Sequence, residues 1–167
     1  MELKADMPYP SLENVGEDCR ALRTVSPAYA GREGELTAIL QYVYQSVFTG
    51  ACGEEDLSRL FISIAVNEMR HVEILGTLIT KLGAPPVFTA CPPYPVGFYS
   101  ASCVNYARSP EGMLAADIQG EKQAIACYKR MLRELCNPCV SEVIGRIVKD
   151  EEVHLSALER AYKKRFS

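Results

Sequence analysis

The sequence contains only two histidines among its 167 residues, and it lacks several features that would indicate other classes of protein. No run of apolar residues approaches the roughly 20 that are needed to span a membrane. Basic residues form no stripe, and the formal net charge at pH 7 is −3. A surface that binds nucleic acid is therefore not expected. These absences exclude a membrane protein and a nucleic-acid-binding protein.

The amino-terminal and cysteine patterns give no sign of export. Residues 1–8 lack the apolar stretch of a signal peptide, which favours a cytoplasmic location. The seven cysteines are odd in number and scattered, so we expect reduced thiols rather than a disulfide framework. Cys136 and Cys139 form a single CxxC pair. This pair suits either a thiol–disulfide role or ordinary small residues at the end of a helix.

Length and composition indicate one globular domain with a sizeable core. Apolar residues make up 48% of the chain and charged residues 23%, which is ordinary for a soluble globular protein. Residues 1–26 show no sustained periodicity, and we interpret them as an irregular arm or a short extra helix. From about residue 27 the pattern becomes helical, so we assign residues 27–167 to a helical domain.

Hydrophobic periodicity predicts four long helices in this domain. They cover about residues 27–49, 54–82, 110–136 and 138–165. Proline and glycine residues at the ends of these segments support the bounds. For example, Ser109 is a typical helix cap and Pro110 occupies the first helical position after it.

Residues 84–109 interrupt the helical pattern with five prolines, at positions 85, 86, 92, 93 and 95. A stretch of this length without periodicity calls for a structural reason. Roughly 25 extended residues can span ~80 Å, whereas a helix of about 27 residues is ~40 Å long. The segment can thus cross the full length of a bundle. We predict an all-α, antiparallel four-helix bundle with one long crossover between its second and third helices.

Each of the two histidines lies three residues after a glutamate. The pairs are Glu68–His71 and Glu151–His154. Residues three apart share one face of a helix, about one turn apart. The carboxylate and the imidazole of each pair can therefore reach the same bound ion.

The two halves of the helical domain repeat one another. Glu35 and Tyr42 on the first predicted helix match Glu121 and Tyr128 on the third, with Ala and Ile at the same offsets between them. The second and fourth helices share the Glu-x-x-His motif, which follows the first glutamate at similar separations. The chain therefore reads as two copies of one helical hairpin.

Four glutamates in apolar stripes are costly unless they are paired or coordinated, and facing carboxylates repel one another. Two divalent cations would offset their charges. This ligand set is that of di-iron and di-manganese helical bundles. The alternative, surface glutamates with histidines satisfied by core hydrogen bonds, explains any one of the residues but not the twofold pattern. The predicted metal ligands are Glu35, Glu68, His71, Glu121, Glu151 and His154.

On these motifs the chain resembles the ferritin-like superfamily, in the style of rubrerythrin-type and manganese-catalase-type proteins. The resemblance covers about residues 30–165 and rests on the four segments 34–45, 67–75, 120–125 and 150–155. It implies a di-metal centre of iron or manganese held by the six residues above. It also implies redox work on peroxide or dioxygen.

Three features depart from the relatives that the chain resembles. Peroxide-reducing rubrerythrins typically carry a second glutamate where this chain has Ile118. They often carry a rubredoxin module with two CxxC pairs, and this chain has one pair. In manganese catalases the fourth-helix glutamate, here Glu151, can serve as a base rather than a ligand, so both roles stay open.

Several further residues are candidates to support the site. Tyr42 and Tyr128 lie two turns after Glu35 and Glu121, and they either bond the metal-bound carboxylates, act as redox partners, or are ordinary core tyrosines. Asp117 and Asp150 are candidates to accept the outer proton of a metal-bound histidine. We favour Asp117, because it lies one turn before Glu121.

The function expected from the sequence is that of an oxidoreductase with two ions of iron or manganese, removing peroxide in the manner of a catalase or peroxidase. The catalytic candidates are Glu151, Tyr42 and Tyr128. Ferrous-iron oxidation with sequestration, or a structural protein with a vestigial site, are the alternatives. Glutamate and histidine suit both metals. We expect a homodimer or larger homo-oligomer, and an external electron donor stays open.

Overall fold

The structure is a computed structural model that describes residues 3–91 and 97–166. Within these ranges its regular secondary structure is helical, apart from an isolated β-bridge between Thr89 and Phe98. Pro92, Pro93 and Pro95 of the predicted crossover lie outside the described residues. The helices are α1 Cys19–Ala30, α2 Glu35–Ala51, α3 Glu55–Lys81, α4 Pro110–Glu134 and α5 Pro138–Phe166, with a short 3-10 turn at Ala101–Cys103.

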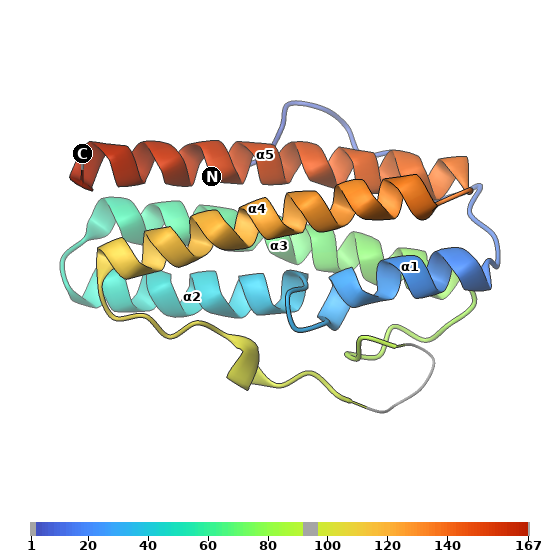
Figure 1. Ribbon diagram of the computed structural model, residues 1–167, viewed down its shortest axis with the longest axis horizontal. Helices are drawn as coiled ribbons and strands as arrows, with labels where there is room; N and C mark the ends of the chain where they lie inside the picture. Colours follow the sequence, from blue (N-terminus) through green and yellow to red (C-terminus); the bar gives the residue numbers. More distant parts are fainter. Residues whose placement is uncertain (1–2, 92–96, 167) are drawn as a thin grey trace.

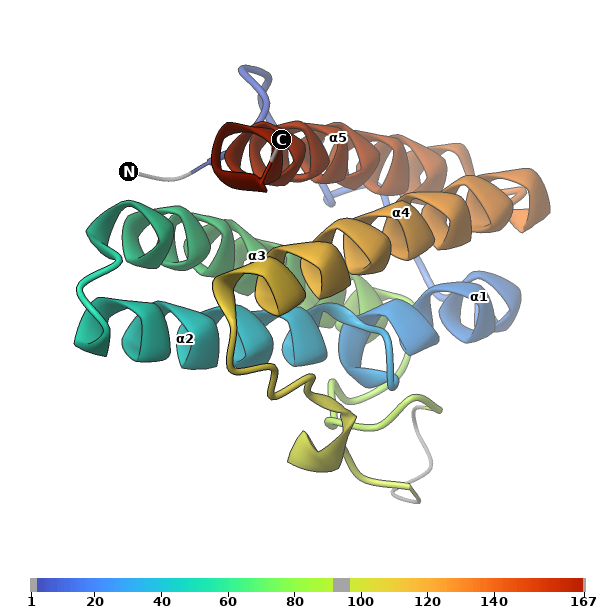
Figure 2. The same cartoon turned by 60° about the vertical axis from the view of Figure 1, so that its left-hand side comes forward.

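Two antiparallel hairpins build the bundle (Figure 1). The first pairs α2 with α3, and the second pairs α4 with α5. The described parts of the segment between α3 and α4, residues 82–91 and 97–109, lie along the outside of the bundle between the end of α3 and the start of α4, as both views show (Figure 2). The predicted ferritin-like four-helix bundle with one long crossover is confirmed.

The first predicted helix differs from the structure, because residues 27–49 do not form one continuous helix. Residues up to Ala30 belong to α1, and α2 begins only at Glu35. Helix α1 continues beyond the amino-terminal end of α2, so that together they occupy one side of the bundle (Figure 1). Most of α1 comes from the segment that we interpreted as an arm or short extra helix.

Close backbone packing explains why the helix breaks before Glu35. The amide of Gly31 donates to Pro27 O at 2.9 Å, which closes α1. A Cβ atom on Gly31 would lie 2.4 Å from Pro27 O, and one on Gly34 would lie 2.6 Å from Ala28 O. Only glycine fits at both positions, so this turn is set by the backbone rather than by a side-chain pattern.

The apolar core consists of two clusters, one towards each end of the bundle. The first joins α1 to the carboxy-terminal halves of α3 and α4 and the amino-terminal half of α5, with Leu78 and Ile144 fully buried. The second joins α2 to the opposite halves of those helices, around Phe61, Leu114 and Leu158. Burial of each such side chain contributes about 1.5–3 kcal/mol. The polar middle of the bundle lies between these clusters.

The helix ends follow the expected capping chemistry. The Ser109 hydroxyl accepts a hydrogen bond from Gly112 N at 3.1 Å, and Pro110 opens α4 as predicted. The Asn137 side chain accepts from Val140 N at 3.2 Å, at the start of α5. Both helices therefore begin at fixed positions, which fixes the register of the residues they carry. Among the described residues, no helix is long and apolar enough to cross a membrane.

Substituting Gly34→Ala should destabilise the fold, because the new methyl group would collide with the carbonyls of α1. We expect a loss of about 1–3 kcal/mol in the free energy of unfolding, measured by denaturant titration. Gly145→Ala is the matched control, since nothing lies within 4 Å of its Cβ position inside α5. That change should stabilise the protein by up to about 1 kcal/mol. Equal stability of Gly34→Ala and wild type would contradict the close-packing account.

Candidate metal centre

All six predicted ligands meet in the middle of the bundle. Each is at most 5% exposed. Glu35 is the first residue of α2, whereas the other five lie in the interiors of α3, α4 and α5. The structure therefore brings together every residue that the repeat predicted. They are Glu35, Glu68, His71, Glu121, Glu151 and His154.

Glu68 and Glu151 lie between the two imidazoles, each with one oxygen facing each ring. The Glu68 oxygens are 2.7 Å from His71 Nδ1 and 3.1 Å from His154 Nδ1. The Glu151 oxygens are 3.2 Å and 3.1 Å from the same two atoms. Both carboxylates are therefore placed to bridge two ions, each ion held by one histidine.

The remaining two glutamates lie at the outer sides of the site. A Glu35 oxygen is 3.7 Å from His71 Nδ1, and a Glu121 oxygen is 3.8 Å from His154 Nδ1. The ligand atoms thus form two overlapping groups, in each of which all atoms lie within 4.8 Å of one another. The groups are Glu35, Glu68, His71 and Glu151, and Glu68, Glu121, Glu151 and His154.

The two candidate tyrosines bond the outer glutamates of the opposite repeat. The Tyr42 hydroxyl donates to Glu121, and the Tyr128 hydroxyl donates to Glu35. Burial raises the pKa of both tyrosines well above 10, and the neighbouring carboxylates raise it further. Both phenols therefore remain protonated donors at neutral pH. Their role as redox partners stays a prediction.

The outward ring nitrogens of the histidines have acceptors of their own. His71 Nε2 lies 3.1 Å from Asp150 Oδ2. His154 Nε2 lies 3.0 Å from Asn67 Oδ1 and 2.9 Å from the carbonyl of Leu3. A proton on Nε2 satisfies these acceptors and leaves the Nδ1 lone pair directed into the site. This is the tautomer that a metal ligand requires.

The preference for Asp117 as the histidine's partner was wrong, because Asp150 holds that position. Asp117 is buried, as predicted, but it faces α2 rather than α3. Its Oδ1 accepts hydrogen bonds from Gln41 Nε2 at 2.7 Å and from Gln45 Nε2 at 2.9 Å. Position one turn before Glu121 predicts burial, but it does not specify which helix the side chain faces.

The amino-terminal arm forms the outer layer of the site. Asp150 accepts hydrogen bonds from Ala5 N at 2.8 Å and from the Tyr9 hydroxyl at 2.5 Å. Arg146, one turn earlier on α5, lies 2.6 Å from Asp150 Oδ1 and donates to Met7 O at 2.8 Å. Its guanidinium also stacks 4.3 Å from the centre of the Tyr9 ring. The arm is thereby fixed against α5.

This outer layer keeps Asp150 ionised. Burial opposes its charge, but hydrogen bonds from His71, Tyr9 and Arg146 hold the pKa of Asp150 well below its usual range. Burial and the bond to Asp150 raise the pKa of Tyr9 to about 12. Sequence reasoning missed Tyr9 and Arg146. The arm carries no periodic pattern, and the bond between Tyr9 and Asp150 joins residues far apart in the chain.

A cavity of about 710 Å³ connects this site with the surface between α2 and α4. Its inner wall includes Glu35, Glu68, Glu121 and Glu151. Its outer wall is formed by the turn between α1 and α2, by α4 and by Asn105 of the crossover. The break in the first helix therefore lies at the opening that leads to the metal centre.

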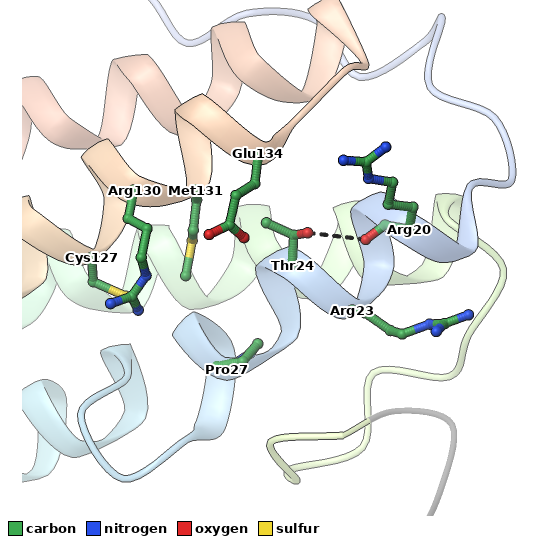
Figure 3. A pocket seen from close by; sticks show the side chains of 8 residues that line it. All are labelled: Arg20, Arg23, Thr24, Pro27, Cys127, Arg130, Met131 and Glu134. Atoms are coloured by element: carbon green, nitrogen blue, oxygen red, sulfur yellow. Dashed lines mark hydrogen bonds between the residues drawn. The ribbon is translucent and has the colours of Figure 1, made fainter.

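A second cavity, of about 590 Å³, lies between α1 and the carboxy-terminal part of α4 (Figure 3). Arg20 and Arg23 line it from α1, and Glu134 lies between the two helices. Cys127 lines both cavities. The CxxC pair lines neither of them. Cys136 is exposed, Cys139 is partly buried, and all seven cysteines are free in the structure.

The residues present fit two metal ions. Four buried carboxylates surround two imidazoles, and buried charges require compensation. Burial raises the pKa of Glu121 well above its usual range, and the charge of Glu151 adds to this effect. Carboxylate oxygens and imidazole nitrogens in this number suit iron or manganese. Two divalent cations would relieve the repulsion that this arrangement otherwise contains.

Two sequence comparisons match part of this chain to manganese catalases. A family model described as manganese-containing catalase matches residues 16–88. A probable manganese catalase from Clostridium acetobutylicum is 24% identical over 152 residues, covering 80% of this chain and 66% of that protein. This chain thus spans just under two thirds of that relative's length.

Solved structures extend the likeness to nearly the whole chain. KatB, a manganese catalase from Anabaena, has a TM-score of 0.79 at 21% identity, covering 98% of this chain and 80% of its own. The bacterioferritin of Mycobacterium tuberculosis has a TM-score of 0.73 at 24% identity, covering 89% and 87%. The chain has the ferritin-like fold. In this chain the helix before Glu35 is broken, and residues of the arm contact His154 and the Asp150 partner of His71.

Substituting Tyr9→Phe should weaken metal retention, because it removes the hydroxyl that donates to Asp150 while the ring stays against Arg146. Loss of a residue that bonds a metal ligand directly typically lowers metal affinity by about 10–100-fold. Tyr9 acts through Asp150, so we expect a loss at the lower end of this range, about 10-fold. Competition with a graded series of chelators measures this change. Tyr106→Phe is the control, since the exposed Tyr106 hydroxyl donates only to Ala101 O at 3.0 Å. Equal metal affinity of the two variants would contradict a role for the arm.

Metal loading should release protons at neutral pH. Burial alone would lower the pKa of His71 and His154, but Glu68 and the neighbouring carboxylates raise both well above their usual value. In the metal-free protein this charge stabilises the fold at low pH, and the contribution is lost as pH rises through the raised pKa values. Ions must displace these protons from Nδ1.

We therefore expect release of about two protons per chain on loading, and an apparent metal affinity that increases with pH. Calorimetric titration in two buffers of different ionisation enthalpy counts the protons. Loading without proton release at neutral pH would show that the imidazoles are neutral before the ions bind.

Proposed function

We propose that this chain is a dinuclear iron or manganese oxidoreductase that removes hydrogen peroxide in the manner of a catalase or peroxidase. The observation that carries the proposal is the pair of ligand groups that share Glu68 and Glu151. Two ions held in this way would lie side by side at the inner end of an open cavity. A small substrate can reach both ions at once from that side.

The six predicted ligands divide between the two ions. Glu35 and His71 would hold one ion, Glu121 and His154 the other, and the two central glutamates would bridge them. When bound, the metal pair would supply or accept the two electrons that peroxide chemistry requires and would polarise the oxygen–oxygen bond. The rest of the chemistry falls to the protein, which must orient ligands and exclude bulk water.

The surrounding residues restrict movement of the ligands. Tyr42 and Tyr128 fix the outer carboxylates, so that these cannot rotate freely when the ions change charge. Asp150 and Asn67 fix the two imidazole rings through their outer nitrogens. The apolar clusters on both sides close the bundle ends to water. These contacts preorganise the site before substrate enters.

The relatives support this proposal. The matching family model describes manganese-containing catalases, and the Clostridium acetobutylicum relative is a probable manganese catalase. Catalase turnover needs no external electron donor, which suits a chain with a single CxxC pair. Because glutamate and histidine bind both metals, we propose iron or manganese without preference.

One observation favours a second function, ferrous-iron oxidation with sequestration. Glu151 faces both histidines in the same way as Glu68, so it is not set aside as a separate base near the ions. An iron-oxidising site needs only to bind two ferrous ions and pass their electrons to an oxidant. The same ligand geometry would serve that reaction.

We also propose that the protein forms a homodimer or larger homo-oligomer. Ile62, Val66 and Met69 lie along one face of α3 and are each at least 40% exposed. Val47 of α2 is 70% exposed. Adjacent exposed apolar side chains of this kind mark surfaces that associate with other chains.

Peroxide consumption by the metal-loaded protein tests the leading function. We expect dioxygen release on adding hydrogen peroxide to protein with two ions per chain, measured with an oxygen electrode. Glu121→Gln should retain about one ion, whereas Glu68→Gln should retain less than one, because Glu68 belongs to both ligand groups. Both should lose at least about 100-fold in rate. Glu142→Gln, an exposed position on α5, is the control.

The outcome separates the two functions. Protein with two ions that neither releases dioxygen nor consumes peroxide with a reductant would rule out the leading proposal. Rapid oxidation of added ferrous iron, with the iron then retained by the protein, would support the second.

A further inference from the structure

Asp117 is a buried acid on the wall of the cavity that leads to the metal centre. It is 1% exposed and lies on α4, one turn before Glu121. Its Oδ1 accepts both amide hydrogen bonds, from Gln41 and Gln45 of α2. Its Oδ2 is buried and has no hydrogen-bond partner among the described residues. One oxygen is therefore fully engaged, and the other is open to a ligand or a proton.

The position of the two amide donors determines where a proton would bind. Two N–H groups on the same oxygen favour the carbonyl character of Oδ1, which leaves Oδ2 as the site of the acidic proton. No cation pairs with Asp117 in the part of the chain that the structure describes. A buried carboxylate without a cation is costly, and the amides offset only part of that cost. Burial accordingly raises the pKa of Asp117 to about 7, against the lowering effect of Gln45 and Gln41.

Gln41 connects this acid to the surface of the molecule. Its Oε1 accepts a hydrogen bond from the backbone amide of Asn105, an exposed residue of the crossover, at 2.9 Å. Gln41, Asn105 and Asp117 all line the cavity. Asp117 therefore lies where water entering from outside can exchange protons with it.

The other titratable groups of the cavity are unsuited to this exchange. Tyr42 on α2 and Tyr128 on α4 have pKa values well above 10, and each already donates to a carboxylate. Cys103 and Cys127 also line the cavity, but both are only partly buried thiols, and burial raises the pKa of Cys127. The carboxylates on the inner wall are the proposed metal ligands. At the mouth lie the charged residues Arg32, Glu33 and Arg130. Asp117 is the deeply buried acid of the cavity that is neither a proposed ligand nor at its mouth.

Peroxide chemistry requires protons as well as electrons. Reduction of one peroxide consumes two electrons and two protons and gives two waters. Oxidation of a second peroxide to dioxygen releases two electrons and two protons. The electrons belong to the metal pair of the proposed function, on which this inference rests. Glu151 faces both histidines, so the proposed function assigns it to the ions rather than to proton transfer. A different residue is therefore needed to hold a proton near the site.

We propose that Asp117 is the proton-holding residue of this cavity. It gives the proton on Oδ2, through cavity water, to the peroxide oxygen that leaves as water when the oxygen–oxygen bond breaks. It takes a proton back when the second peroxide is oxidised to dioxygen. The other proton of each half-reaction exchanges with the water in the cavity, so both half-reactions balance.

Asp117→Asn in the metal-loaded full chain tests this role. Asparagine keeps the acceptor for Gln41 and Gln45 but holds no acidic proton at the second position. We expect two ions per chain and a peroxide consumption about 100-fold slower than wild type. Asp56→Asn, the same chemical change at an exposed position on α3, should leave the rate unchanged.

The pH profile distinguishes a proton carrier from a structural residue. The acid form of Asp117 is present below its pKa and lost above it. In wild type, the reduction of peroxide should therefore slow as pH rises through about 7, and this step should be absent in Asp117→Asn. Gln45→Met removes one amide donor that stabilises the carboxylate. It should shift the step to higher pH without loss of metal, and it gives a second test if Asp117→Asn does not fold.

Infrared spectroscopy gives a readout that does not depend on activity. In metal-loaded wild type the six ligands would carry no carboxyl proton, so the carbonyl stretch of the protonated Asp117 carboxyl group can be followed by itself. This band should disappear as pH rises through about 7. The band should be missing in Asp117→Asn and retained in Asp56→Asn. In Gln45→Met it should disappear at a higher pH than in wild type.

The outcomes separate this inference from the proposed function. If wild type consumes peroxide and Asp117→Asn does so at the same rate with the same pH profile, the role of Asp117 is overturned and the function stands. An infrared band that does not depend on Asp117 also overturns it. If loaded wild type consumes no peroxide, both the function and the proton role fail.

Discussion

The structure depends on the burial of four carboxylates and two imidazoles between two apolar clusters. Such a group of like charges would destabilise the bundle if nothing compensated it. The surrounding contacts are arranged to limit this cost, since each outer carboxylate accepts a tyrosine hydroxyl and each imidazole has an outer acceptor. In the metal-free protein the protonated imidazoles supply part of the compensation, and bound ions would supply it in the loaded protein. The fold therefore holds the six side chains in position, while bound ions would compensate the charge of the carboxylates.

The two hairpins contribute equally to the centre and unequally to its surroundings. The ligand groups follow the internal repeat, with one outer glutamate and one histidine from each half. The outer acceptors do not, because His71 meets a carboxylate and His154 meets an amide and a backbone carbonyl. The two metal positions are thus chemically distinct. A symmetric ligand set within asymmetric surroundings allows the two ions to differ in affinity and potential.

Local sequence spacing predicted the parts of the molecule that local geometry determines. The Glu-x-x-His motifs located the site, because residues three apart on a helix must share a face whatever the helix packs against. The long crossover followed from proline content and length. The break before Glu35 could not be predicted in this way, since Gly34 is required by carbonyls that approach it only in the folded chain. The partner of Asp117 was missed for the same reason, because its amide donors come from another helix.

The arm has a consequence for the order in which the protein can be completed. His154 near one end of the chain meets the carbonyl of Leu3 near the other, and Asp150 meets Ala5 and Tyr9. During synthesis residues 3–9 emerge from the ribosome long before α5, so these contacts cannot form until α5 has been made. The outer partners of the two imidazoles are therefore completed later than the hairpin of α2 and α3, although that hairpin already carries His71.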